Sequence, residues 1–169
     1  MTRVYVPTTL TGLARAQKQG SLDDAEDPTG PRLLAHAVTG AVREWYLEGN
    51  LEELEYSALI DAAESSLRLL ALQPDEPRRR VVVAIDVPEE LVSPGGADRS
   101  SVQITGPVEL SRVVSVHIDE VDSQAIIAAA VDALAAAADG DDDARFQLDE
   151  AEACDLLWYD ISEIDDLIG

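Results

Sequence analysis

The sequence predicts a single α+β domain over residues 1–169, in which helices pack against a mixed β-sheet of about five or six strands. The chain has 169 residues, of which 46% are hydrophobic, as expected for one globular domain. Residues 78–87 form a β-branched run typical of an interior strand, whereas residues 51–72 repeat apolar side chains at helical spacing. The expected order is strand, helix, strand, two helices, three strands, helix, strand, without an internal repeat.

The first forty residues are expected to form two strands and one helix. Residues 3–7 alternate apolar and polar side chains as a short strand does, and residues 9–19 favour a helix that ends at Gly20. Residues 21–31 combine turn residues with charge and are predicted to form a loop. Residues 32–39 favour a strand, although a helix also fits their pattern.

The middle of the chain is expected to contain a helical pair followed by three strands. A helix over residues 40–49 is interrupted at Gly49-Asn50, and a longer helix over residues 51–72 is ended by Pro74 and Pro77. The strands that follow are predicted at residues 78–87, 102–110 and 112–119. A flexible loop, residues 93–101, precedes the second of these strands.

The last third is expected to contain one helix and a final strand. Asp122 or Ser123 can cap a helix that continues through residues 125–139, and Gly140 ends it. Four of its side chains are predicted to face inward: Ile126, Ile127, Ala130 and Leu134.

The chain after this helix is expected to begin with a solvated turn at residues 139–145. Residues 153–162 have strand chemistry. Residues 163–169 fit either a final helical turn packed on the domain or an acidic docking tip.

Charge is the strongest compositional signal. The formal net charge is −22, and residues 119–169 hold sixteen acidic residues against the single base Arg145. This acidic carboxy-terminal third repels phosphate groups, which argues against direct nucleic-acid binding and against anionic membranes. A basic protein partner is the class of partner that the charge favours.

The single cysteine, Cys154, cannot form an intramolecular disulfide or a cysteine-based zinc site. The first ten residues lack the long apolar stretch of a secretory signal, and no run of about 18 uncharged apolar residues is present. A cytoplasmic location is therefore expected.

No cofactor and no metal are predicted. Glycine-rich phosphate-binding motifs are absent from the sequence. Residues 139–143 gather four aspartates, but Ala144 stands where a calcium loop that starts at Asp139 needs glycine.

The two histidines are candidate polar-site residues. His117 and Asp119 share one face of a predicted strand, so the carboxylate could orient the imidazole. No nucleophile with a supporting motif completes a catalytic set, and a histidine at a strand end near solvent is the simpler interpretation. A polar pocket would combine His36 and His117 with Arg43, Glu44 and Asp119.

Four of the seven aromatic residues form two pairs, Trp45-Tyr46 and Trp158-Tyr159. In a strand the members of the second pair point to opposite faces, and in a helix those of the first diverge by about 100°. The pairs can line an aromatic-edged groove, or they can cover the edges of the sheet.

Six stretches resemble, in order and over nearly the whole chain, a family of small, acidic, uncharacterised actinobacterial proteins. They are "RVYVPTTL", "AHAVTGAVREWY", "EELEYSAL", "RRVVVAIDV", "RVVSVHID" and "LLWYDIS". The resemblance implies a self-contained cytoplasmic domain from a GC-rich bacterium. It carries no activity, cofactor or catalytic residue.

The function that these observations favour is a non-enzymatic cytoplasmic interaction or regulatory module that uses its acidic surface and exposed aromatics. One alternative is a small enzyme or small-molecule binder with a polar pocket around His36 and His117. Another is an acidic inhibitor that mimics DNA. Neither the partner nor the oligomeric state follows from the sequence.

Overall fold

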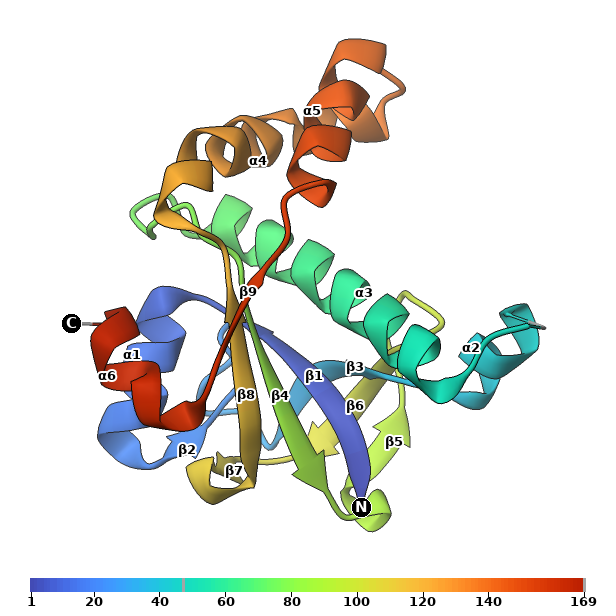
Figure 1. Cartoon of the computed structure of the whole chain (residues 1–169), viewed down its shortest axis with the longest axis vertical. Helices are drawn as coiled ribbons and strands as arrows, with labels where there is room; N and C mark the ends of the chain where they lie inside the picture. Colours follow the sequence, from blue (N-terminus) through green and yellow to red (C-terminus); the bar gives the residue numbers. More distant parts are fainter. Residues whose placement is uncertain (47, 169) are drawn as a thin grey trace.

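A seven-stranded antiparallel sheet forms the centre of the computed structural model, which describes residues 1–46 and 48–168 (Figure 1). The strand order is β5-β6-β3-β1-β4-β8-β9, and β2 and β7 form a separate antiparallel pair. The strands are β1 (Thr2–Thr8), β2 (Ser21–Leu22), β3 (Arg32–Ala37), β4 (Val81–Val87), β5 (Val92–Pro94), β6 (Ser101–Thr105), β7 (Val108–Glu109), β8 (Val113–Ile118) and β9 (Leu157–Tyr159).

The prediction of a mixed sheet with five or six strands is wrong in two respects. Every pair of neighbouring strands in the seven-stranded sheet is antiparallel, so the sheet is not mixed. A buried strand has the same composition in either direction, so the pattern alone could not decide this. The sheet is larger than expected because residues 93–94 of the predicted loop belong to the three-residue strand β5.

The two faces of the sheet are covered by different helices. One face packs against α1 (Leu10–Gln19) and α6 (Ile164–Ile168), which lie beside each other (Figure 1). The other face packs against α3 (Leu51–Leu72), whose Ala58 and Ala62 contact β1 and β4. Residues 81–85 of β4 are buried on both faces, which confirms the prediction of an interior strand.

Local capping explains where the helices begin and end. The side chain of Thr9 accepts a hydrogen bond from the Gly12 N–H, and α1 ends at Gly20, whose φ of 82° favours glycine. The side chain of Asn50 caps α3, and the bounds of α3 are those predicted. The preceding helix α2 (Gly40–Trp45) is shorter than the predicted helix at 40–49, of which Leu47 lies outside the described residues.

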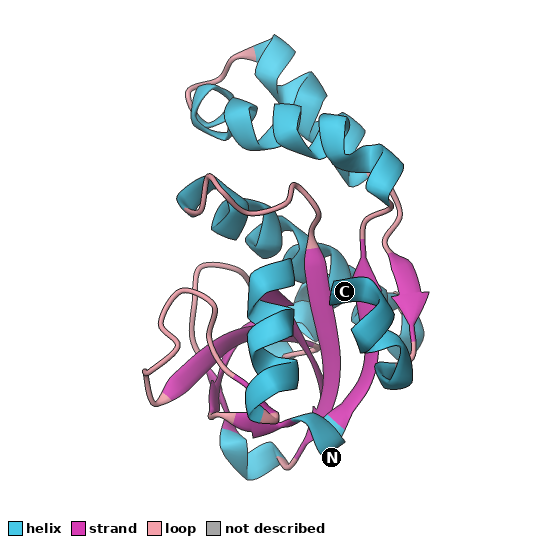
Figure 2. Ribbon diagram, turned by 90° about the vertical axis from the view of Figure 1, so that its left-hand side faces the viewer, coloured by secondary structure: helices cyan, strands magenta, loops and turns pink. Residues whose placement is uncertain are grey.

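Helices α4 (Gln124–Ala138) and α5 (Asp142–Glu152) form a hairpin that stands at one end of the molecule (Figure 2). The predicted solvated turn at 139–145 is wrong in extent. Asp141 caps α5, and two more aspartates occupy its first turn, where negative charge stabilises a helix. The turn itself is short and contains Gly140, with a φ of 91°.

The inward face of α4 also differs in part from the prediction. Ile127 and Ala130 are buried against Leu67 and Leu70 of α3, but Ile126 is 38% exposed. Consecutive helical residues point about 100° apart, so Ile126 and Ile127 cannot both face α3. Within the described residues, Val121–Ala138 is the one helical stretch long and apolar enough to cross a bilayer, by length and composition alone. Core helices of water-soluble proteins meet the same criterion.

The carboxy-terminal segment packs on the sheet as far as Ile168, the last described residue. Only Leu157–Tyr159 of the predicted strand at 153–162 forms β9, an edge strand beside β8. Ile164 of α6 is buried in the main core, and Leu167 and Ile168 pack against the same cluster. Four short 3-10 helices complete the chain: η1 (Glu89–Leu91), η2 (Leu110–Arg112), η3 (Val121–Ser123) and η4 (Ile161–Glu163).

A buried ion pair joins the start of β4 to the end of β8. The Arg80 guanidinium donates to both carboxylate oxygens of Asp119, at 2.8 and 2.7 Å, and to the carbonyl of Cys154 at 2.9 Å. The backbone N–H of Arg80 donates to the same carboxylate at 2.7 Å. Arg80 is 5% exposed and Asp119 is 0% exposed.

We expect Asp119→Asn to lower the free energy of unfolding by about 3–5 kcal/mol, because it leaves the Arg80 guanidinium buried without a counter-charge. Urea unfolding followed by circular dichroism measures this loss. The matched control is Asp86→Asn, in an ion pair with Arg3 whose side chains are 37% and 38% exposed. That change should cost about 1 kcal/mol or less. Equal losses in the two variants would contradict the role assigned to burial.

Candidate functional site

A groove lies between the amino-terminal half of α3 and the strands β1, β4, β8 and β9. It encloses about 410 Å³. Its wall on α3 includes Glu52, Glu55 and Tyr56, and its floor on the sheet includes Tyr5 and Ala84. The other lining residues are Arg3, Leu59, Val114, Ser115, His117 and Trp158.

Strand register places these side chains on one face. Tyr5 pairs with Ala84, and Ala84 pairs with Ser115. Two residues after Ser115 on β8, His117 pairs with Trp158 of β9. Side chains two residues apart on a strand point to the same face, so His117 and Ser115 both line the groove. The methyl group of Ala84 leaves space at its centre.

Polar contacts hold the floor of the groove in place. The Tyr5 hydroxyl donates to Glu55 at 3.3 Å, and Arg3 donates to Asp86 at 2.6 and 3.2 Å. Burial, followed by the charge of Glu55, raises the pKa of Tyr5 to about 12. Tyr5 therefore stays protonated and donates to Glu55 at neutral pH.

His117 is a neutral member of this groove. Its Nε2 lies 2.9 Å from the Ser115 Oγ. Burial lowers the pKa of His117, and the positive charge of Arg3 lowers it further. The imidazole of His117 therefore adds no positive charge to the groove at pH 7.

The rim of the groove combines exposed aromatic rings with carboxylates. Trp158 is 61% exposed and Tyr56 is 57% exposed. Glu52 and Glu55 lie on the same wall as Tyr56, whereas the one arginine of the groove, Arg3, is paired with Asp86. The groove therefore presents net negative charge beside two aromatic faces.

A second constellation surrounds His36, which is fully buried beneath α3. Its Nε2 lies 2.8 Å from the Ser65 Oγ, and its Nδ1 lies 2.9 Å from the Ser100 Oγ. The Ser100 hydroxyl in turn donates to Asp61 at 2.7 Å. Burial lowers the pKa of His36, although the charges of Asp61 and Asp98 oppose that effect.

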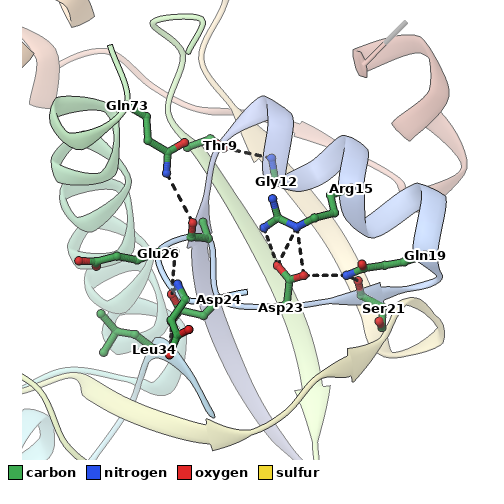
Figure 3. Close-up of polar contacts among 12 residues, drawn as sticks. Thr9, Gly12, Arg15, Gln19, Ser21, Asp23, Asp24, Glu26, Leu34 and Gln73 are labelled. Atoms are coloured by element: carbon green, nitrogen blue, oxygen red, sulfur yellow. Dashed lines mark hydrogen bonds and ion pairs between the residues drawn. The ribbon is translucent and has the colours of Figure 1, made fainter. Parts of the chain in front are cut away.

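A cavity of about 170 Å³ lies beside Ser65. One wall is the segment predicted as the loop 21–31, which side-chain hydrogen bonds hold in place. In Figure 3 the side chains of Arg15 and Gln19 converge on Asp23, with distances from 2.6 to 3.2 Å. The Asp24 carboxylate accepts a hydrogen bond from the Leu34 N–H at 2.9 Å (Figure 3).

The structure separates the residues of the predicted polar pocket. His36 on β3 and His117 on β8 are three strand spacings apart, roughly 14 Å. Asp119 is bound to Arg80 and does not orient His117, which forms a hydrogen bond with Ser115 instead. Arg43 lines a different hollow, near Met1 and Asp86, and Glu44 is exposed on α2.

The two aromatic pairs are also separate. Trp158 lines the groove, whereas Tyr159 points to the opposite face and packs against the main core, as the strand alternation predicted. Trp45 is 59% exposed and lies under the Arg99 guanidinium, 3.6 Å from the ring centre. Tyr46 accepts a hydrogen bond from Ser57 of α3 at 3.3 Å.

The sequence analysis did not identify Tyr5, Glu55 and Tyr56 at the groove. It also did not identify Ser65 and Asp61, which belong to the hydrogen-bonded group around His36. The separations of Tyr5 from Glu55 and of His36 from Ser65 in sequence explain this, since no local motif connects them. The one available signal was Tyr5 between Val4 and Val6, which places a polar tip on the face opposite the valines. Among the described residues, no group of three metal-ligating side chains is assembled.

The model of DUF6912, a family of unknown function, matches residues 2–168. The chain belongs to this family. The match agrees with the resemblance of the six sequence stretches to an uncharacterised family. Neither the search of curated proteins nor the search of solved structures found a match to this DUF6912 chain.

We expect both histidines to titrate below the ordinary value of 6.5, because burial lowers each pKa. As the pH falls through 6.5, the unfolded chain takes up protons that the folded chain does not. The free energy of unfolding should therefore be highest above that pH and decrease on acidification. Proton NMR titration measures the two midpoints, and His117→Gln assigns them because the chain has only two histidines. A His36 midpoint at or above 6.5 would contradict its assigned environment.

Proposed function

We propose that this chain is a binding module that captures a basic segment of a partner protein in the groove beside α3. The observation that carries the proposal is the combination of exposed Tyr56 and Trp158 with Glu52 and Glu55 around one hollow. An arginine or lysine side chain gains from both features, because the aromatic faces attract cations and the carboxylates accept hydrogen bonds.

The charges within the groove favour a cationic occupant. Arg3 is the one arginine in the lining, and its guanidinium is bound to Asp86. The lowered pKa of His117 keeps that ring neutral at pH 7. Glu52 and Glu55 therefore dominate the charge that an incoming side chain meets.

Each aromatic contact with a cation contributes roughly 0.5–1 kcal/mol at an exposed site, and more where water is excluded. Two such contacts and one carboxylate support modest affinity for a single side chain. A peptide that also covers Leu59 and Val114 would bury additional apolar area. The groove is thus suited to a short basic segment with apolar neighbours.

The field of the whole chain supports the same partner chemistry. The net charge is −22, and the sixteen acidic residues of positions 119–169 include those of α5 and α6. Such a field increases the rate at which basic partners associate and decreases with added salt. The groove supplies the local specificity that a diffuse field lacks.

A Trp45→Phe variant leaves Trp158 as the only tryptophan and allows binding to be followed by its fluorescence. We expect an acetylated, amidated Gly-Arg-Gly-Arg-Gly peptide to change Trp158 emission saturably, and the corresponding glutamate peptide to have no effect. Binding should weaken as salt is raised, because the contact with Glu55 is electrostatic.

Glu55→Gln should weaken binding of the arginine peptide by roughly tenfold, about 1.4 kcal/mol. The matched control is Glu64→Gln, the same charge change on the same helix, where Glu64 is paired with Arg68 at 2.9 Å. Calorimetry on both variants measures the difference. Equal affinity in the two variants, or equal binding of the glutamate peptide, would overturn the proposal.

A further inference from the structure

Four polar side chains form one hydrogen-bonded chain beneath α3. Asp61 and Ser65 lie one helical turn apart on α3, His36 lies on β3, and Ser100 lies just before β6. The three links run from Asp61 to Ser100 at 2.7 Å, to His36 at 2.9 Å and to Ser65 at 2.8 Å. These contacts bring together residues from three separate segments.

The Asp61 carboxylate determines which group donates each of these three hydrogen bonds. An ionised carboxylate only accepts, so the Ser100 hydroxyl donates to Asp61. The Ser100 oxygen then accepts from the N–H at Nδ1 of His36. The lone pair of the imidazole is therefore at Nε2, and Ser65 donates its hydroxyl proton to it.

His36 is suited to hold this neutral form. Its side chain is 0% exposed, and burial favours the uncharged ring. The charges that act on it are Asp61, Asp98 and Arg68. Two of these are carboxylates, which stabilise the imidazolium when a proton is transferred to Nε2.

The cavity of about 170 Å³ places open space next to Ser65. Leu34, Leu69 and Leu72 give it an apolar wall, and Gly96 and Ala97 of the loop before β6 line another side. The charged residues of its lining are Asp24, Glu26, Arg68 and Asp98. Within the described residues, neither the Gly96 nor the Ala97 backbone N–H donates a hydrogen bond to a backbone carbonyl.

We propose that Ser65 is a nucleophile that accepts the acyl group of a small ester, with His36 as its general base. Asp61, acting through Ser100, is a positioning residue that fixes the ring tautomer. The volume of the cavity limits the acyl group to a short chain, which the leucine wall would contact. This site is separate from the peptide groove and does not depend on it.

The reaction balances with the groups present and water. Ser65 Oγ bonds to the ester carbonyl carbon while its proton passes to His36 Nε2. The C–O bond to the alcohol breaks, and the alcohol leaves with that proton, which gives an acyl-serine. Water then attacks the acyl-serine with His36 again taking a proton, and the carboxylic acid and free Ser65 are produced.

The direct test is labelling of the folded chain with a small alkyl fluorophosphonate, which forms a stable bond with activated serines. We expect one adduct per chain, mapped to Ser65 by mass spectrometry, and none on the urea-unfolded chain. Ser65→Ala should abolish it, whereas Ser57→Ala, on the same helix, should retain it. The same Ser65→Ala variant should lose hydrolysis of 4-nitrophenyl acetate above the rate with buffer.

Asp61→Asn tests the positioning role separately. We expect its labelling to be slower by roughly a hundredfold. The acid limb of its pH profile should move to lower pH, because the Asp61 charge raises the pKa of His36. A structural role alone would not move that limb.

The wild-type labelling decides the matter even if a variant fails to fold. No adduct on Ser65, or adducts on several serines at equal rates, would overturn the proposal and leave the chain of hydrogen bonds a packing feature. Ser65 does not line the peptide groove. Measuring peptide binding by the Ser65→Ala variant therefore distinguishes failure of the serine site from failure of the groove.

Discussion

The buried pair of Arg80 and Asp119 determines where the carboxy-terminal third attaches to the sheet. After Asp119 the chain leaves the sheet to form α4 and α5, and at Cys154 it returns toward β9. The Arg80 guanidinium contacts both points, since it binds the Asp119 carboxylate and the Cys154 carbonyl. One side chain therefore holds both ends of the helical hairpin. The position of β9, and with it Trp158 at the groove, depends on this attachment.

Helix α3 carries the second constraint, because both proposed sites use it. Ala58 and Ala62 allow the helix to lie close to β1 and β4. Its amino-terminal half supplies Glu52, Glu55 and Tyr56 of the groove. Its middle supplies Asp61 and Ser65 above His36. Small residues on the sheet-facing side thus bring polar residues of the same helix into contact with both sites.

The elements that the sequence predicted well are those whose signals are local. The helix at 51–72 has a cap at Asn50 and a stop at Pro74, and the strand at 78–87 has a β-branched run, so each is specified by adjacent residues. Strand direction, the edge strand β5 and the extent of α5 depend on partners far along the chain or on capping by Asp141. Three of the four aspartates at 139–143 stabilise the start of α5, as its cap and in its first turn.

The residues of the two candidate sites also divide into those specified by local signals and those that depend on distant partners. The opposite orientation of Trp158 and Tyr159 could be predicted from strand alternation alone. The partners of the histidines could not, because Ser65 and Ser100 are 29 and 64 positions from His36. Sharing a strand face also did not ensure contact between His117 and Asp119, since the buried Arg80 competes for that carboxylate more strongly than a neutral imidazole does.

The arginines explain why the surface remains acidic despite twelve basic residues. Arg3, Arg15 and Arg80 bind carboxylates within the fold, and Arg68 and Arg145 pair along their own helices. A paired guanidinium neutralises one carboxylate, and the 34 acidic residues far outnumber the 12 lysines and arginines. Among the described residues neither Glu52 nor Glu55 forms an ion pair, and both lie beside aromatic faces that attract cations. The internal use of arginine thus leaves the groove open to a cation from another molecule, which is why a basic segment suits it.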